Sequence, residues 1–94
     1  MLTSAERIAL IHERLTTALA PTHLEIIDES YLHKGHAGAK TGAGHFAIEI
    51  SSKTLADKNA VQAHRLIYAA LNDLIPKEIH ALRIKIINAK GTTF

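Results

Sequence analysis

The stretch "HFAIEISS", residues 45–52, decides the fold because its apolar side chains alternate along the chain. Phe46, Ile48 and Ile50 fall on one face, and Ala47 and Glu49 fall on the other. Alternation with a period of two is typical of a strand that packs one face against a core and turns the other to water. The stretch therefore predicts a half-buried strand.

Two further stretches predict strands on either side of it in the sequence. They are "HLEIID", residues 23–28, and "ALRIKIIN", residues 81–88. In the latter, apolar and basic side chains alternate: Leu82, Ile84 and Ile86 against Arg83 and Lys85. We expect strands 23–28 and 45–52 to form an antiparallel hairpin, although their connection is far longer than a tight turn.

Helical signals flank these strands. "TSAE", residues 3–6, fits a capping box with Thr3 as N-cap, and Pro21 ends the apolar pattern that follows, so we predict a helix over residues 4–19. After a polar link at residues 53–60 with at most one helical turn, a second helix ends at Pro76. Its apolar stripe is wide enough to face a sheet and comprises Val61, Ala63, Leu66, Ile67, Ala70, Leu71 and Leu74.

The predicted element order is helix, strand, strand, helix, strand. This is an α+β arrangement, and a three-stranded sheet with both helices on one face buries every apolar stripe. A chain of 94 residues makes one domain, residues 1–94, and the tail at about 89–94 is predicted to be disordered.

Composition excludes several classes of function. The chain has no cysteine, so disulfides, cysteine nucleophiles and metal sites built from its own thiolates are excluded. It shows neither a secretory signal nor an apolar run that could span a membrane, so we expect a cytoplasmic protein without a membrane partner. A net charge of +2 is too mild to indicate nucleic-acid binding by itself.

The stretch "YLHKGHAGAKTGAGHF", residues 31–46, holds three of the seven histidines and four of the five glycines. His33 and His36 are spaced H-x-x-H, which suits a metal ion. On this spacing alone, solvated loop histidines are the favoured interpretation, since a structural zinc site needs four ligands. A phosphate loop needs glycine directly before its lysine and again five residues earlier, but here Ala39 and Lys34 occupy those two positions. Residues 35–38 match the GXXG of RNA-binding KH domains, but that motif belongs between two helices and this one lies between two predicted strands. Nothing nearby forms an oriented catalytic triad, so we predict no enzyme.

Other candidate residues lie outside that stretch. His80 stands alone before the last strand, where a histidine is usually a cap or packing residue unless another element supplies a partner. His64 and Arg65 on the second helix, with Arg83 and Lys85 on the third strand, either contact phosphates together or form a solvated face.

Four segments together resemble the BolA family, over about residues 4–90. They are "LEIIDESYLHKGHAG" (24–38), "HFAIEI" (45–50), "AHRLIYAAL" (63–71) and "IHALRIK" (79–85). The resemblance implies an α-β-β-α-β fold akin to a class II KH domain. It also implies a non-enzymatic protein that shares a bridging 2Fe-2S cluster with a monothiol glutaredoxin. Some members of the family are instead DNA-binding transcriptional regulators tied to stress and cell shape.

The resemblance also implies particular ligands. His80 matches the family's ligand at the start of the last strand. The loop ligand is His33 when counted forward from "DES", or His36 when counted back from "HF". With no cysteine in this chain, the thiolates must come from the glutaredoxin and glutathione. Under the alternative, DNA would contact His64, Arg65, Arg83 and Lys85, although Ala63 stands where the family usually has a polar residue. We expect the free protein to be a monomer or a weak homodimer.

Overall fold

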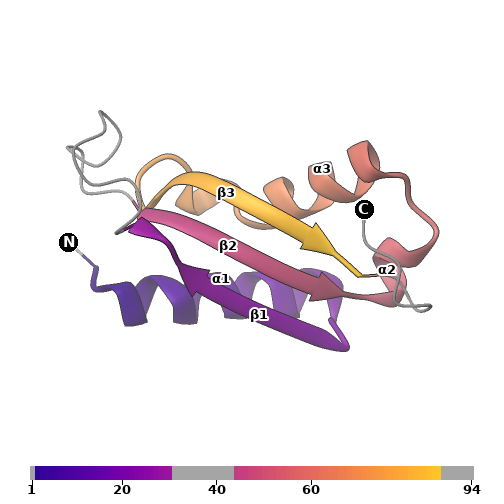
Figure 1. Cartoon of the computed structure of the whole chain (residues 1–94), viewed down its shortest axis with the longest axis horizontal. Helices are drawn as coiled ribbons and strands as arrows, with labels where there is room; N and C mark the ends of the chain where they lie inside the picture. Colours follow the sequence, from indigo (N-terminus) through magenta and orange to yellow (C-terminus); the bar gives the residue numbers. More distant parts are fainter. Residues whose placement is uncertain (1, 31–43, 88–94) are drawn as a thin grey trace.

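The computed structural model describes residues 2–30 and 44–87. Its elements run α1 (Ser4–Leu19), β1 (His23–Asp28), β2 (Gly44–Ser51), α2 (Lys53–Ala56), α3 (Ala60–Ala70), the 3₁₀ helix η3 (Asn72–Leu74) and β3 (Ile79–Ile86) (Figure 1). The predicted order is confirmed, and α2 is the single helical turn expected in the polar link. Residues 89–94, predicted to be a disordered tail, lie outside the described residues.

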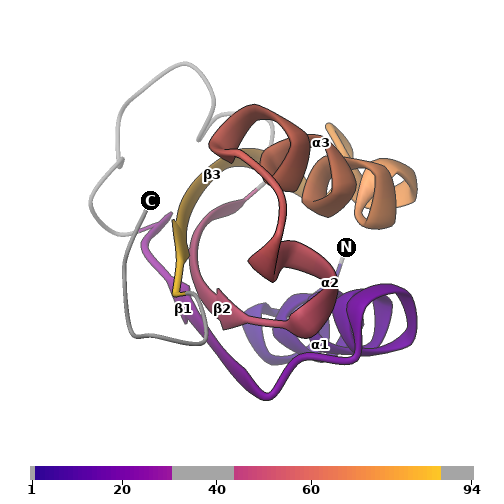
Figure 2. The ribbon, with the colours of Figure 1, turned by 90° about the vertical axis from the view of Figure 1, so that its right-hand side faces the viewer.

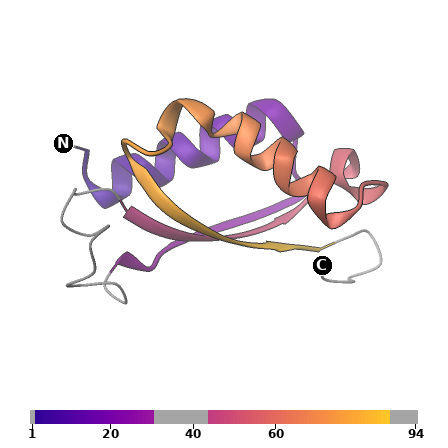
Figure 3. The same cartoon turned by 90° about the horizontal axis from the view of Figure 1, so that it is seen from above.

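The three strands form one mixed sheet in the order β1-β2-β3. β1 pairs with β2 in the antiparallel sense, as the hairpin prediction requires, whereas β2 pairs with β3 in the parallel sense. Parallel neighbours need a long crossover connection. The segment from α2 to η3 supplies it and lies with α1 on one face of the sheet (Figures 2 and 3). No helix of the described residues lies on the other face, which is called the helix-free face below.

The core lies between the sheet and this helical layer. β2 contributes Phe46, Ile48 and Ile50, each at most 1% exposed, so the alternation in the opening stretch is confirmed. The helices add Ile11, Leu15, Leu19, Leu55, Ala63, Ile67, Leu71 and Leu74. On the helix-free face Ala47 is also buried, because β2 has a neighbouring strand along both of its edges.

Three sequence predictions differ from the structure. The second helix, predicted to continue to Pro76, ends at Ala70 and is followed by the 3₁₀ helix η3. The third strand begins at Ile79 rather than Ala81, since Ile79 is buried and pairs with Gly44; its predicted end, Asn88, lies outside the described residues. Val61, assigned to the buried stripe of the second helix, is 59% exposed. It lies two residues before Ala63, which is about 200° around a helix of 3.6 residues per turn.

The ends of α1 follow local chemistry. Thr3 Oγ1 accepts a hydrogen bond from the Glu6 N–H at 3.1 Å, and the Glu6 carboxylate accepts one from the Thr3 N–H at 2.9 Å, which is the predicted capping box. At the other end Ala20 adopts a left-handed conformation, with φ 43°, directly before Pro21. The helix therefore spans the predicted residues 4–19.

Ser52 joins the two parts of the helical layer. Its hydroxyl donates to the Leu19 carbonyl at 2.5 Å and accepts from the Thr54 N–H at 3.2 Å. The residue is only 4% exposed, so neither group has ready access to water if the hydroxyl is removed. Ser52 thus satisfies the last turn of α1 and the first turn of α2 at once.

We predict that Ser52→Ala lowers the free energy of unfolding by about 1–3 kcal/mol, because two backbone groups lose their partner inside the protein. Ser51→Ala is the matched control, since its hydroxyl makes no hydrogen bond within residues 2–30 and 44–87. Urea denaturation followed by circular dichroism measures both. Equal effects of the two substitutions would contradict the role assigned to the Ser52 hydroxyl.

Candidate functional site

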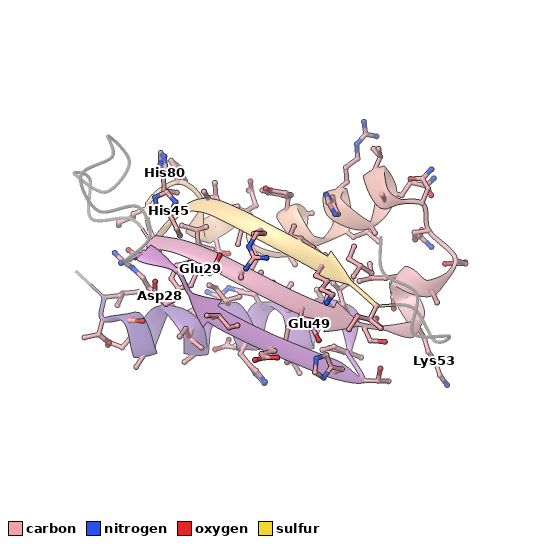
Figure 4. The ribbon with its side chains drawn as sticks, in the orientation of Figure 1. Asp28, Glu29, His45, Glu49, Lys53 and His80 are labelled. Carbon is pink, nitrogen blue, oxygen red and sulfur yellow. The ribbon has the colours of Figure 1, made fainter. Side chains whose placement is uncertain are left out.

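The candidate site lies at the end of the sheet where β1 ends and β2 and β3 begin. Figure 4 shows Asp28, Glu29, His45 and His80 gathered there, at the end of the molecule where the described chain stops after Ser30 and resumes at Gly44. The three strand ends meet because β1 runs against β2 and β3 runs with it. Residues that are 52 positions apart in the sequence, such as 28 and 80, thereby lie at the same end of the sheet.

A change in register places His80. Gly44 pairs with Ile79, but the next residue, His45, pairs with Ala81, so β3 holds one extra residue at this step, namely His80. An extra residue bends a strand and re-aims its side chain, and such bulges are frequent beside functional sites. Here both His80 and Ala81 are exposed. The irregularity therefore presents the His80 imidazole to solvent at the corner of the sheet.

His45 lies against His80. The two ring centroids are 5.1 Å apart and the rings are tilted by 54°. His45 is only 7% exposed, so its ring forms a fixed surface on which His80 rests. The sequence interpretation placed His45 in the glycine-rich stretch but gave it no role. The sequence feature that could have identified His45 is its position directly before Phe46, which places it on the face of the strand opposite to the core.

A chain of hydrogen bonds fixes the start of β2. Asp28 accepts from the Ser4 hydroxyl at 2.5 Å and from the Ser30 N–H at 2.8 Å. The Ser30 hydroxyl in turn accepts from the His45 N–H at 3.1 Å, and the Glu29 N–H donates to the His45 carbonyl at 2.7 Å. α1 and the end of β1 thus hold the backbone of His45 from both sides.

The same contacts shift the pKa of Asp28. Partial burial acts to raise the pKa of this carboxyl group. Hydrogen bonds from Ser30 and Ser4, with the nearby Arg7 charge, favour the carboxylate and outweigh burial, so the pKa of Asp28 lies below its usual value. Asp28 is therefore a carboxylate that the folded protein stabilises.

An ion pair fixes the start of β3. The Arg7 guanidinium donates through Nε to the Glu78 carboxylate at 3.0 Å, and the two side chains are only 10% and 15% exposed. The Glu78 carbonyl also accepts from the Gly44 N–H at 3.0 Å. α1 therefore contacts the segment immediately before Ile79 and His80, and the first residue of β2 is bonded to the same segment.

Gly44 leaves room for the Phe46 side chain. A Cβ at Gly44 would lie 2.5 Å from the Phe46 ring and 3.3 Å from the Ser30 hydroxyl. No real side chain occupies such a position without moving its neighbours. The absence of a side chain at Gly44 is therefore required where β2 begins.

The structure does not bring the four predicted phosphate contacts together. His64 and Arg65 lie on α3, in the helical layer, whereas Arg83 and Lys85 lie on the helix-free face of the sheet. Arg83 donates to both oxygens of Glu29, at 3.1 and 2.6 Å, and these hydrogen bonds raise its pKa. Lys85 Nζ lies 3.9 Å from a Glu49 oxygen. Both strand cations already face carboxylates.

His33 and His36, the two candidate loop ligands, lie outside the described residues. Of the predicted metal ligands the structure therefore places only His80. The assignment of the loop ligand stays a prediction.

A family model described as BolA-like protein matches residues 15–90 of this chain. The chain belongs to the BolA-like family. The BolA domain of SufE1 from Arabidopsis thaliana superimposes with a TM-score of 0.80 at 36% identity, covering 98% of this chain and 100% of that one. The solution structure of BolA1 from Mus musculus gives a TM-score of 0.75 at 30% identity, covering 96% and 71%. The predicted family and fold are thus confirmed.

Several curated relatives of this BolA-like chain are longer proteins. It is 42% identical over 79 residues to SufE-like protein 1 of Arabidopsis thaliana, spanning 79% of this chain and 21% of the relative. It is 40% identical over 81 residues to protein BOLA1 of the same plant, spanning 83% and 51%. It is 34% identical over 74 residues to the DNA-binding transcriptional regulator BolA of Escherichia coli, spanning 79% and 68%. The chain thus spans about a fifth of the length of SufE-like protein 1 and about half of the length of BOLA1.

The location of this BolA-like protein stays a prediction. No helix within the described ranges is long and apolar enough to cross a bilayer. The two plant relatives are named as chloroplastic, or as chloroplastic and mitochondrial, so family membership does not decide in favour of the cytoplasm.

We predict that Asp28→Asn lowers the free energy of unfolding at pH 7 by about 1–3 kcal/mol. Because the pKa of Asp28 is lower in the folded than in the unfolded protein, its contribution is present above the unfolded value near 3.8. It is lost as the pH falls through the folded value. Urea denaturation between pH 7 and pH 2 should therefore show a shallower acid loss of stability in the variant.

Asp57→Asn is the control for this experiment, because Asp57 is an exposed carboxylate whose ion pair with Lys58 is screened by solvent. Lys58 lowers the pKa of Asp57 as well, but Asp57 is exposed to solvent, so the acid profile of Asp57→Asn should depart from that of the unmodified protein much less than the profile of Asp28→Asn does. An unchanged profile in Asp28→Asn would show that the hydrogen bonds around Asp28 do not favour its charged form.

Proposed function

We propose that this chain is a BolA-like adaptor that binds a monothiol glutaredoxin and co-ligates a bridging 2Fe-2S cluster, in iron-sulfur trafficking or iron sensing. His80 would be one ligand, and His33 or His36 the other. The role is one of binding and presentation rather than catalysis. It extends the family membership to a specific partner and cofactor.

The observation that carries this proposal is the position of His80. Its imidazole is exposed on a bulge at the corner of the sheet, beside the point where residues 31–43 join β1 to β2. A ligand to a cluster held by another protein must be accessible, yet its backbone must be fixed. The buried His45 ring and the Arg7–Glu78 ion pair provide that support from two sides.

The donor set of the chain suits a shared cluster. Iron in a 2Fe-2S cluster is held mostly by thiolates, and imidazoles replace two of them in Rieske centres, which raises the reduction potential. This chain has seven histidines and no cysteine, so it can supply imidazoles only. The glutaredoxin cysteine and glutathione would supply the thiolates. Bound there, the cluster would provide a one-electron or iron-sensing centre.

We predict that mixing the protein with a monothiol glutaredoxin carrying its glutathione-ligated cluster changes the visible absorption and circular dichroism spectra. Replacement of a thiolate by the His80 imidazole alters the charge-transfer bands of the iron. His80→Ala should remove the change and weaken the one-to-one complex by at least about tenfold, in the range seen when metal-site residues are lost. Titration with the His33→Ala and His36→Ala variants would then identify the loop ligand.

His64→Ala is the matched control, because His64 lies on α3, away from the strand ends. It should retain the spectral change. An unchanged spectrum with the unmodified protein would sink the proposal, as would a change that survives in His80→Ala together with both loop variants. Native mass spectrometry of the mixture would show directly whether a glutathione-containing complex forms.

A second candidate function is DNA binding. The observation in its favour is that a relative 34% identical over 74 residues is named a DNA-binding transcriptional regulator. Against it, Arg83 and Lys85 face carboxylates and lie on a different face from Arg65. The helical layer would have to act alone, through Lys58, His64 and Arg65. We therefore place this function second.

If the chain binds duplex DNA through α3, the logarithm of the binding constant should fall linearly with the logarithm of salt concentration. Arg65→Gln should reduce that slope by about one, because one phosphate contact is lost. Arg83→Gln should change it less, since Arg83 is paired with Glu29. Fluorescence anisotropy with a labelled duplex measures the slope for the unmodified protein and for both variants. A binding constant that does not change with salt concentration would exclude phosphate binding through α3.

A further inference from the structure

Three metal-ligating side chains meet on the helix-free face, away from His80. His23 and Glu25 come from β1 and Glu49 from β2, and one ligand atom of each lies within 4.8 Å of the others. His23 Nε2 lies 3.1 Å from a Glu49 oxygen. Figure 4 shows Glu49 well along β2 from the labelled pair His45 and His80. The cluster therefore belongs to a different part of the sheet.

The strand register creates an electrostatic imbalance in this cluster. Glu25 and Glu49 are direct cross-strand partners. Like charges directly opposite each other destabilise an antiparallel pair. Glu49 has His23 at 3.1 Å and Lys85 at 3.9 Å, whereas Glu25 makes no hydrogen bond or ion pair with any described residue. A carboxylate thus faces a second carboxylate with no cation of its own.

The surroundings of the cluster are suited to an ion with water ligands. A shallow hollow of about 70 Å³ lies beside it, lined by the acidic Glu25 and Glu49, the basic Arg83 and Lys85, and the apolar Ile27, Ala47 and Ile48. A hollow of that size is large enough for ordered water. The ligands stand on paired strands, one of which is the buried centre of the sheet, so their backbones are held in place.

We propose that His23, Glu25 and Glu49 bind a divalent transition-metal ion of the Zn²⁺ type, with water in the remaining position. One imidazole nitrogen and two carboxylate oxygens make a three-ligand set that Zn²⁺ accepts. Ca²⁺ and Mg²⁺ prefer oxygen ligands throughout, so the imidazole distinguishes the two classes of ion. The proposal is independent of the cluster-binding function, because it shares no residue with it.

The first test removes the competing histidines. In the variant His33→Gln/His36→Gln/His80→Gln, titration with ZnCl₂ by calorimetry should show one site per chain. Adding Glu25→Gln or His23→Gln should weaken binding at least about tenfold, as expected when a ligand is lost. Lys85→Gln should strengthen it, because a cation next to Glu49 is removed. CaCl₂ at the same concentration should give no saturable site.

The second test uses the unmodified chain and locates the ion. Zn²⁺ should shift the amide resonances of residues 23–25 and 49–51 in nitrogen-15 spectra. Glu49 lies four residues along β2 from His45, which contacts His80, and four residues of a strand span about 13 Å. The spectra therefore distinguish zinc at the proposed site from zinc at His80. Shifts confined to residues 44–46 and 79–81 would overturn the proposal, and so would calcium binding as strong as zinc binding.

The third test compares the direction of the change in melting temperature without and with zinc. In the His33→Gln/His36→Gln/His80→Gln variant, Glu25→Gln should raise the melting temperature of the metal-free protein, because the Glu25–Glu49 repulsion is gone, and should abolish the further rise that Zn²⁺ gives that variant. Glu13→Gln is the control for loss of an exposed carboxylate, since Glu13 lies on α1. Retention of the zinc-dependent rise in Glu25→Gln would overturn the proposal.

Discussion

The parallel pairing of β2 with β3 is the constraint on which the rest of the structure depends. Because both strands run the same way, the chain must return along the whole sheet between them. It does so through α2, α3 and η3, and the return buries Ala63, Ile67 and Leu71 against the sheet. The same pairing sets the first residues of β2 and β3 side by side, which is how His45 comes to touch His80.

With helices on one face only, the opposite face of the sheet is organised by charge. Glu49 on β2 pairs with His23 and Lys85 on its two neighbouring strands, and Glu29, directly after β1, pairs with Arg83 on β3 across the end of β2. Exposed charged pairs of this kind add little stability, but charges on edge strands such as β1 and β3 discourage pairing with another chain. Within this pattern Glu25 is the exception, and its exposed position opposite Glu49 gives the helix-free face an excess of negative charge at one place.

The strand-end site combines a fixed frame with an accessible ligand. Arg7 and Glu78 form an ion pair that is largely buried, and such a pair contributes little net stability because both charges lose solvation. Its value here is geometric, since it connects α1 to the residues that lead into the bulge. The Asp28 network does the same for β2. His80 itself stays exposed, so a partner can reach its imidazole without unfolding the frame.

The sequence by itself determined the elements whose signals are local. The capping box of Thr3 and Glu6 and the stop at Pro21 predicted residues 4–19 of α1, and alternation predicted the buried face of β2. These predictions are correct because residues only two to four positions apart in the sequence form a helix turn or one face of a strand. The His80 ligand came from a family resemblance carried by four short segments, not from periodicity.

Only the tertiary structure decided the register, and with it both clusters of side chains. The pairing of Gly44 with Ile79 extends β3 to a residue that alternation had left out, and it makes His80 the extra residue of a bulge. Contacts between His45 and His80, or between Glu25 and Glu49, join positions 24 or more residues apart. No local pattern encodes such contacts, because they follow from which strands pair and in which direction.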